Sequence, residues 1–331
     1  MNYIVFDLEW NQSYGGRENE NPRMPFEIIE IGAVKLDEKL HIIDSFSSLV
    51  RPRLYKKIQP HIRTILNIDE KELRSARPFD MVCREFLKWC GDDDYEFCSW
   101  GPMDLSYLQN NMDYYYMKKL PTPLKYYNIQ SIYSEMTEKS SAAVKLEKAV
   151  DHLQIEKDKP FHSAVNDAYY TALVLACLHP KDLKDRYSYD TYNCPKEKKD
   201  EIISYHKNFL EHISREYENR AEAVEDKDLT TLFCYRCGRK TNKKIKWFAN
   251  TPNSYLCIGK CWHHGLMTGK LRFKQSRDDK IFVIKTVVPT DKKSVEAMRQ
   301  RQNELRLKRQ CKRRNKNNSK SDSDSEFEID T

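Results

Sequence analysis

Apolar residues in the first part of the chain fall into short runs that predict strands. Residues 3–10 form an apolar run interrupted by two acids, and residues 27–36 and 42–50 form two more runs joined by a tight turn at 37–40. Each run has the length of a strand and is bounded by turn residues. The pattern therefore predicts three consecutive strands in an antiparallel meander.

Helical periodicity follows the meander. Apolar residues recur at helical spacing in residues 78–90, 104–115, 142–153 and 162–178, and residues 95–100 are typical of a short strand. A meander followed by alternating strands and helices is typical of an α/β domain with a mixed sheet. We expect this domain to cover residues 1–180.

The second half of the chain divides into segments by composition. We expect residues 181–230 to be a charged linker, helical over 198–223, and residues 231–290 to be a small β-rich module with four cysteines. Residues 291–316 predict a basic helix with almost no apolar stripe, which argues against burial. Residues 317–331 predict a disordered acidic, serine-rich tail, because they lack the apolar residues of a packed core.

Two acids end the first predicted strand. Asp7 and Glu9 stand two residues apart, so both side chains leave the strand on the same face. Two neighbouring carboxylates at the end of a buried strand repel each other and lose hydration, and a cation compensates both effects. Mg²⁺ and Mn²⁺ prefer carboxylate oxygens. The alternative is an acidic pair on an edge strand that faces solvent.

Three further polar residues lie at the ends of predicted elements. Asp104 follows the short strand and opens a helix, and His162 and Asp167 lie near the start of a later helix. Five residues on a helix correspond to about 140° around its axis, so His162 is expected in the loop before the helix that carries Asp167. The alternatives are that Asp104 is a helix N-cap and that His162 is an ordinary structural histidine.

Taken together, these motifs resemble the DEDDh branch of the DnaQ-like 3′→5′ exonucleases, in the RNase H-like superfamily. The resemblance covers residues 1–180 and consists of Asp-x-Glu at 7–9, an Asp after Trp-Gly at 100–104, and His-x4-Asp at 162–167. The segments 27–34, 46–52 and 99–104 look most like the subgroup of ERI-type RNA exonucleases and KapD-like proteins. The resemblance implies a five-stranded mixed sheet flanked by helices.

The same resemblance implies two Mg²⁺ or Mn²⁺ ions and a role for each polar residue. By resemblance, Asp7 bridges the two ions, Glu9 and Asp167 hold the ion that carries the attacking water, and Asp104 holds the other. His162 is then the general base, because an imidazole near its free pKa takes up a proton at neutral pH.

The resemblance also implies contacts with the terminal nucleotide. Backbone groups near Leu8 and Glu9 are expected to bind the 3′-hydroxyl, with Leu8 beneath the last base. Trp10 stands where the family usually has a small residue, so it is expected, with Trp100, to help hold this nucleotide.

Four cysteines in the second half have a spacing close to that of zinc ribbons. Cys234 and Cys237 form one pair, and Cys257 and Cys261 form a second pair 19 residues later. Four thiolates suit one structural Zn²⁺ ion. His263 or His264 is an alternative for one thiol, and four free buried cysteines are the alternative to a metal site.

Composition and charge narrow the class of protein. No stretch approaches the roughly 20 apolar residues of a membrane span, and the sequence does not open with a secretory signal. Ten cysteines then indicate reduced thiols in a cytoplasmic protein. The net charge of +7 combines −5 for residues 1–180 with +12 for residues 181–331, which favours a nucleic-acid partner.

We therefore expect a metal-dependent 3′→5′ exonuclease acting on RNA or single-stranded DNA, with a zinc module and a basic helix that retain nucleic acid. Two alternatives remain. One is a regulatory factor that binds nucleic acid or protein on an exonuclease scaffold, as a sporulation inhibitor does. The other is a zinc-ribbon factor of transcription or of the ribosome with an accessory nuclease. The sequence does not say whether the protein has protein partners.

Overall fold

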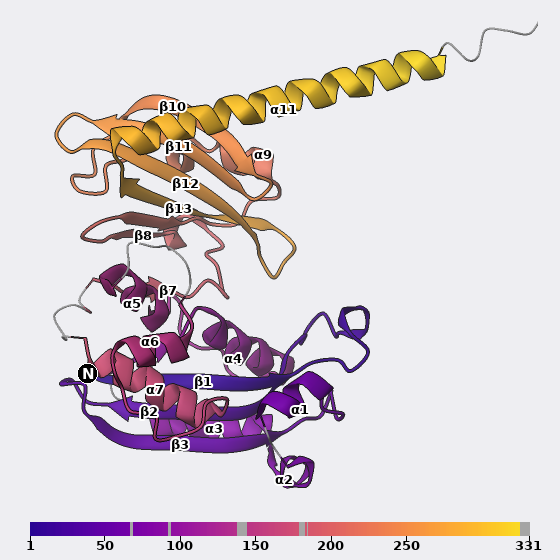
Figure 1. Ribbon diagram of the computed structural model, residues 1–331, viewed down its shortest axis with the longest axis vertical. Helices are drawn as coiled ribbons and strands as arrows, with labels where there is room; N and C mark the ends of the chain where they lie inside the picture. Colours follow the sequence, from indigo (N-terminus) through magenta and orange to yellow (C-terminus); the bar gives the residue numbers. More distant parts are fainter. Residues whose placement is uncertain (67–68, 92–93, 138–143, 179–182, 184, 325–331) are drawn as a thin grey trace, which may run out of the picture. The chain divides into compact units, whose positions relative to one another are not determined.

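The computed structural model describes residues 1–66, 69–91, 94–137, 144–178, 183 and 185–324. The chain forms two compact units, Met1–Asn193 and Cys194–Thr331, here called the N-terminal and the C-terminal unit (Figure 1). The boundary expected at residue 180 lies outside the described residues, and the division falls at Asn193. None of the helices in the described ranges combines the length and the apolar character needed to cross a membrane.

The N-terminal unit is built on a mixed sheet, which confirms the predicted fold class. Its described residues form seven strands in the order β4-β3-β2-β1-β5-β6-β7. These are β1 (Asn2–Asn11), β2 (Glu27–Leu36), β3 (Ile42–Arg51), β4 (Arg77–Pro78), β5 (Tyr95–Ser99), β6 (Lys125–Asn128) and β7 (Ser188–Tyr189). β1, β2 and β3 form the antiparallel meander, whereas β5 and β6 run parallel to β1. The two-residue strands β4 and β7 extend the expected five at the edges.

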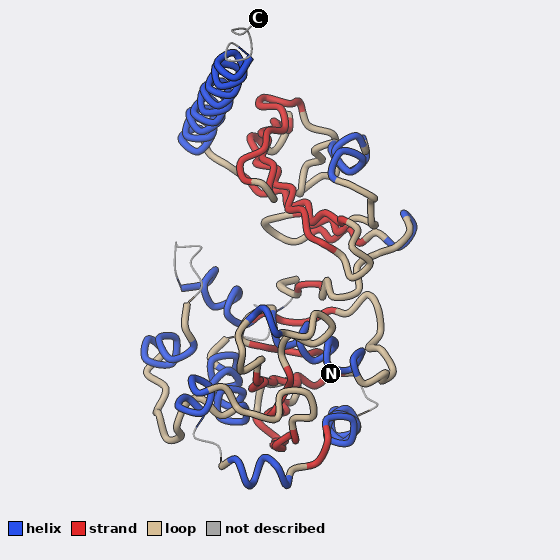
Figure 2. Tube along the Cα trace, turned by 90° about the vertical axis from the view of Figure 1, so that its right-hand side faces the viewer, coloured by secondary structure: helices blue, strands red, loops and turns tan. Residues whose placement is uncertain are grey.

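Helices cover both faces of this sheet (Figure 2). They are α1 (Pro60–Leu66), α2 (Glu70–Ser75), α3 (Phe79–Cys90), α4 (Met103–Tyr114), α5 (Ile129–Thr137), α6 (Leu146–His152) and α7 (Ala164–Ala176), with a 3-10 turn η1 (Arg17–Asn19). Ile4 and Phe6 of β1 pack with α3 and α4, and Tyr3 and Val5 pack with α5, α6 and α7. Because side chains alternate along a strand, the odd-numbered positions of β1 face α7.

The C-terminal unit is built on an antiparallel sheet. Within its described residues the strand order is β10-β11-β12-β13-β9-β8. The strands are β8 (Ile202–Tyr205), β9 (Leu210–Ile213), β10 (Asn242–Thr251), β11 (Ser254–Cys261), β12 (Gly265–Gln275) and β13 (Ile281–Pro289), and the short helical segments are η2 (Lys198–Asp200), α9 (Arg220–Glu225) and α10 (Lys227–Thr230). α9 and α10 pack on one face of the sheet.

The helix predicted over residues 198–223 is wrong, because this segment contains the hairpin of β8 and β9. Its burial alternates with a period of two: Ser204 is buried between exposed Ile203 and exposed Tyr205. The amide of His206 donates to the carbonyl of Phe209 at 2.8 Å and closes the turn. The alternation was not recognised in the sequence because the segment contains many charged residues. The β module is therefore larger than residues 231–290, since β13 pairs with β9.

The basic helix α11 (Lys292–Asp324) has an apolar stripe that the sequence reading missed. Val295 is buried against Ile245, Phe248 and Ile258 on the sheet face opposite α9 and α10, and Leu305 packs nearby. The helix also passes the expected end at residue 316, because residues 317–324 contain neither Gly nor Pro to stop it. Residues 325–331 of the expected tail lie outside the described residues.

Candidate active site

Asp7 and Glu9 lie on β1, on the face that α7 covers. Their neighbours across the β1–β2 ladder are Gly32 for Asp7 and Glu30 for Glu9. The register shifts between Glu9 and Trp10, so the ladder becomes irregular directly after the second acid. Such irregularities bend a strand and redirect its side chains.

Gly32 lets α7 approach the sheet closely. A Cβ atom at this position would lie 2.0 Å from the backbone nitrogen of Val165 and 2.1 Å from the carbonyl carbon of Ala164. Only glycine leaves room for the first turn of α7 at this distance. A glycine inside a predicted strand is a sequence signal for close backbone approach, and it is the one signal that would have located this contact.

Glu30 is a buried acid that the sequence analysis did not identify. Its Oε1 accepts a hydrogen bond from Ser163 Oγ at 3.0 Å. Burial raises the pKa of Glu30, while hydrogen bonds from Ser163 and from the backbone amides of Ala164 and Val165 partly offset the rise. These donors belong to the start of α7, where backbone N–H groups lack partners within the helix. Glu30 therefore fixes the start of α7 on β2.

Asp167 lies in the first turns of α7 and adds a third carboxylate to those of Asp7 and Glu9. Ligand oxygens of Asp7, Glu9 and Asp167 lie within 4.8 Å of one another. His162 lies in the loop just before α7, with an exposed side chain and a positive φ of 67°. Its backbone amide faces both oxygens of Asp167 at 3.3 and 3.4 Å. The loop and the acid are thus tied together by the backbone of His162.

Asp104 reaches the same region from the other layer. It lies in the first turn of α4, after the turn that follows β5, and only 6% of its surface is exposed. Burial raises its pKa to about 7, although hydrogen bonds from its own amide and from the amide of Leu8 act against the rise. The amide of Leu8 thereby links Asp104 to β1 directly beside Asp7.

The carboxyl groups raise one another's pKa values. Burial raises the pKa of Asp7 well above its ordinary value, and the charges of Asp104, Glu9, Asp167 and Glu30 raise it further. The pKa of Glu9 is raised to about 8 and that of Asp167 to about 6, in both cases chiefly by burial. Several buried acids that repel one another at short range form a site for cations.

The side chain of Leu8 does not line this site, so its expected position beneath the terminal base is wrong. Leu8 is 2% exposed and packs with Ile4 and Phe6 toward α3 and α4, because even-numbered positions of β1 face away from α7. Trp10 is partly buried, and its ring meets that of Tyr107 edge-on at 4.8 Å.

Trp100 lies directly after β5 and is partly buried. Its Nε1 donates to the carbonyl of Val144 at 3.2 Å, and its ring packs 6.0 Å from that of Tyr133. The described contacts of Trp100 therefore hold it against α5 and the segment before α6.

A second group of candidate metal ligands lies in the C-terminal unit. It consists of Cys234, Cys237, Cys261 and His264. The distances are 3.8 Å for Cys237 Sγ to Cys261 Sγ, 3.5 Å for Cys234 Sγ to His264 Nδ1, and 3.8 Å for Cys261 Sγ to His264 Nδ1. A tetrahedral zinc with ordinary bond lengths requires about 3.8 Å between sulfurs and about 3.6 Å between sulfur and nitrogen. The donor set fits Zn²⁺.

Cys257 is not part of this group, so its assignment as a ligand is corrected to His264. Cys257 and Cys261 are four residues apart on the extended strand β11, which separates them by roughly 13 Å. His264 instead follows Cys261 in the turn between β11 and β12. Burial raises the pKa of the Cys257 thiol to about 12, as expected for a core cysteine.

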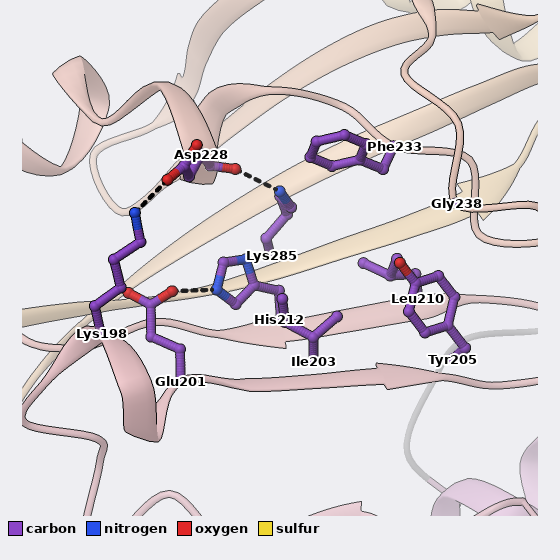
Figure 3. A pocket seen from close by; sticks show the side chains of 10 residues that line it. All are labelled: Lys198, Glu201, Ile203, Tyr205, Leu210, His212, Asp228, Phe233, Gly238 and Lys285. Carbon is purple, nitrogen blue, oxygen red and sulfur yellow. Dashed lines mark hydrogen bonds and ion pairs between the residues drawn. The ribbon is translucent and has the colours of Figure 1, made fainter.

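A pocket of about 380 Å³ in the C-terminal unit has different chemistry (Figure 3). Its polar groups bind one another. Lys285 donates to the carbonyls of Leu229 at 2.8 Å and Thr231 at 3.0 Å, and His212 Nε2 lies 2.9 Å from Glu201 Oε2. These groups therefore form a hydrogen-bonded structural network that lines the pocket.

Comparison with known proteins gave the following matches. A model of the exonuclease family RNase_T matches residues 4–175. The probable 3′-5′ exonuclease KapD of Bacillus subtilis (strain 168) is 28% identical over 123 residues, which is 37% of this chain and 57% of that protein. The chain thus spans little more than half the length of this curated relative.

Two solved structures share 22% identity with the chain. The nuclease domain of 3′hExo, a DEDDh family member bound to rAMP, has a TM-score of 0.48 over 57% of this chain and 96% of its own. A structure titled for 3′-end specific recognition of histone mRNA stem-loop by 3′-exonuclease has a TM-score of 0.47 over 57% of this chain and 84% of its own.

Proposed function

The chain belongs to the exonuclease family, and from this premise we propose that its N-terminal unit is a DEDDh-type domain and that the protein is a metal-dependent 3′→5′ exonuclease. It hydrolyses the phosphodiester bonds of RNA or single-stranded DNA from the 3′ end. One observation carries the proposal: Asp7, Glu9 and Asp167 place their ligand oxygens within 4.8 Å of one another.

The carboxylates suit two Mg²⁺ or Mn²⁺ ions. All the donors are hard oxygens, and their raised pKa values reflect a repulsion that bound cations relieve. In this assignment Asp7 would contact both ions, Glu9 and Asp167 would hold one ion, and Asp104 would hold the other. Such a pair of ions would supply a hydroxide at neutral pH and would stabilise the leaving 3′-oxygen.

His162 is the general base in this mechanism. An imidazole nitrogen of His162 accepts the proton that the attacking water loses. Two observations support the role: the side chain is exposed, and the backbone amide faces the carboxylate of Asp167. The base and one metal ligand are therefore positioned by the same short segment.

The terminal nucleotide binds beside the carboxylates. Backbone groups near Leu8 and Glu9 contact the 3′-hydroxyl, and Trp10 and Trp100 limit the space for the base and sugar. The partial burial of both tryptophans supports this role, because packed rings are fixed in position.

The C-terminal unit contributes binding. Cys234, Cys237, Cys261 and His264 would hold one structural Zn²⁺ ion, and their spacing, which suits a tetrahedral site, supports this assignment. The basic unit then retains the nucleic acid while the N-terminal unit removes nucleotides.

An end-labelling assay tests the nuclease proposal. RNA and DNA labelled at the 5′ end, single- and double-stranded, are incubated with Mg²⁺ or Mn²⁺. We expect ladders that shorten from the 3′ end and need the metal. Asp7→Asn should abolish them, whereas Glu38→Gln, which removes an exposed acid in the turn between β2 and β3, should not. Cleavage by the Asp7→Asn protein at the wild-type rate would refute the site.

A further inference from the structure

Trp262 is exposed to a degree that is unusual for the largest apolar side chain. Its relative exposure is 86%. All five tryptophans lie in the described ranges, and the other four are partly buried. An exposed indole gains little from folding, and tryptophan is among the residues that are enriched where proteins bind their partners.

The candidate zinc ligands fix the position of Trp262. It lies in the turn between β11 and β12, directly after Cys261 and two residues before His264. Next to it, His263 Nε2 lies 2.9 Å from Arg239 Nη1. Arg239 comes from the loop after Cys237, so the two ligand loops are in contact at the residue that follows Trp262.

The sequence on both sides of Trp262 contains cations and no acids, and the nearby acid Glu211 comes from β9, where the charges of Arg272 and Lys274 act on it. Residues 229–277 contain 11 Lys or Arg and no Asp or Glu. The whole chain has 50 acids in 331 residues, so a stretch of this length would carry about seven at the average frequency. An interface with an ordinary protein surface does not require the complete absence of acids. A polyanion favours it, because each carboxylate would repel a phosphate.

The cations include a row on the sheet. Lys270, Arg272 and Lys274 are exposed at alternate positions of β12, while Leu271 and Phe273 between them are buried. Side chains two residues apart on a strand point to the same face. β12 begins at the turn that carries Trp262, so the row starts from the same hairpin.

We propose that Trp262 is a stacking platform for an unpaired base, and that the cations of its hairpin contact the adjacent phosphates of a single-stranded nucleic acid. A base stacks on an exposed aromatic ring in any sequence, whereas the bases of a duplex are already stacked on one another. The inference deepens the proposed function and rests on it in one respect, namely that the bound strand is the substrate.

The test measures binding by full-length protein that carries Asp7→Asn, so that the probe is not degraded. Fluorescence anisotropy with a 5′-labelled uridine 12-mer and with a 12-base-pair RNA duplex compares this parent with added Trp262→Ala, Trp262→Phe or Tyr116→Ala. Tyr116 is the matched control, because it is 84% exposed and lies in the N-terminal unit just after α4.

Trp262→Ala should weaken binding of the single strand by about 5- to 150-fold, the loss of one base–aromatic stack. Trp262→Phe should restore most of it, and duplex binding should not change. Tyr116→Ala should bind as the parent does. Unchanged binding by Trp262→Ala, or an equal loss for single strand and duplex, would overturn the proposal. The assay needs no cleavage, so a wild-type protein without nuclease activity would refute the proposed function and leave this result standing.

Discussion

Replacing Gly32 by alanine should disable the site without touching a ligand. The added Cβ would lie 2.0 Å from the backbone nitrogen of Val165, whereas ordinary contacts begin at 3.4 Å. The obstacle is helix backbone, which has no rotamer to adopt, so α7 must recede from β2 by about 1.4 Å. Asp167 and His162 move with α7. Since metal–ligand distances tolerate only about 0.2 Å, the carboxylate set would no longer fit its ions.

We expect Gly32→Ala to lower the rate of 3′-end removal by about 10²-fold or more, because a shift of 1 Å has this effect in active sites. Overpacking should also cost about 1–3 kcal/mol of stability. The assays are single-turnover cleavage of a labelled oligonucleotide and thermal unfolding. Gly15→Ala is the matched control, because the three atoms nearest to its new Cβ all belong to the flexible side chain of Asn19. A folded Gly32→Ala protein with the wild-type rate would refute the argued contact between β2 and α7.

Three further predictions follow from the structure. His162→Ala should slow cleavage by roughly 10²–10⁴-fold and leave the Mn²⁺ affinity, measured by calorimetry, unchanged. The control is His41→Ala, which replaces an exposed histidine and should behave as wild type. A loss of Mn²⁺ affinity in His162→Ala would make His162 a metal ligand. Burial lowers the pKa of Lys285 to about 8. Between about pH 8 and 10.4 the side chain of Lys285 is therefore protonated in the unfolded chain and neutral in the native state. The contribution of Lys285 to the free energy of unfolding consequently rises with pH across that window. In urea unfolding Lys285→Met should remove that rise, and an unchanged pH profile would contradict the assignment. His264→Ala should lose zinc in metal analysis while Cys257→Ser keeps it, and the reverse result would restore the cysteine assignment.

The alternation of side chains along β1 made part of the site predictable from sequence. Asp7 and Glu9 share a face because side chains alternate, and that inference needs no knowledge of the partner element. Contacts at Gly32 and Glu30 bring α7 to these two acids. These contacts join distant parts of the chain, since Ser163 and Glu30 are more than 130 positions apart. Periodicity within one element carries no information on such pairs, so the second half of the site followed only from the resemblance.

The C-terminal unit shows where local patterns mislead. The dense charges of the segment with β8 and β9 suggested a solvated helix, yet pairing with β13 made it a hairpin. The cysteine spacing predicted a cluster of candidate metal ligands, and the structure contains one, but with His264 in the place of Cys257. Spacing counts residues, whereas ligation depends on whether the chain between them is extended or turned, and β11 extends through Cys257.

Glu30 explains how a cluster of mutually repelling acids stays assembled. Folding brings Asp7, Glu9 and Asp167 together although each raises the energy of the others, so other contacts must hold α7 in place. Glu30 does so by accepting hydrogen bonds from Ser163, and from the amides at the start of α7. Because Glu30 is itself an acid, its charge also raises the pKa values of Asp7 and Glu9. A glutamine at position 30 would have only one oxygen to accept these hydrogen bonds, and it would lack the negative charge of the carboxylate. The acid thus anchors the helix and at the same time increases the negative potential that attracts cations to the site.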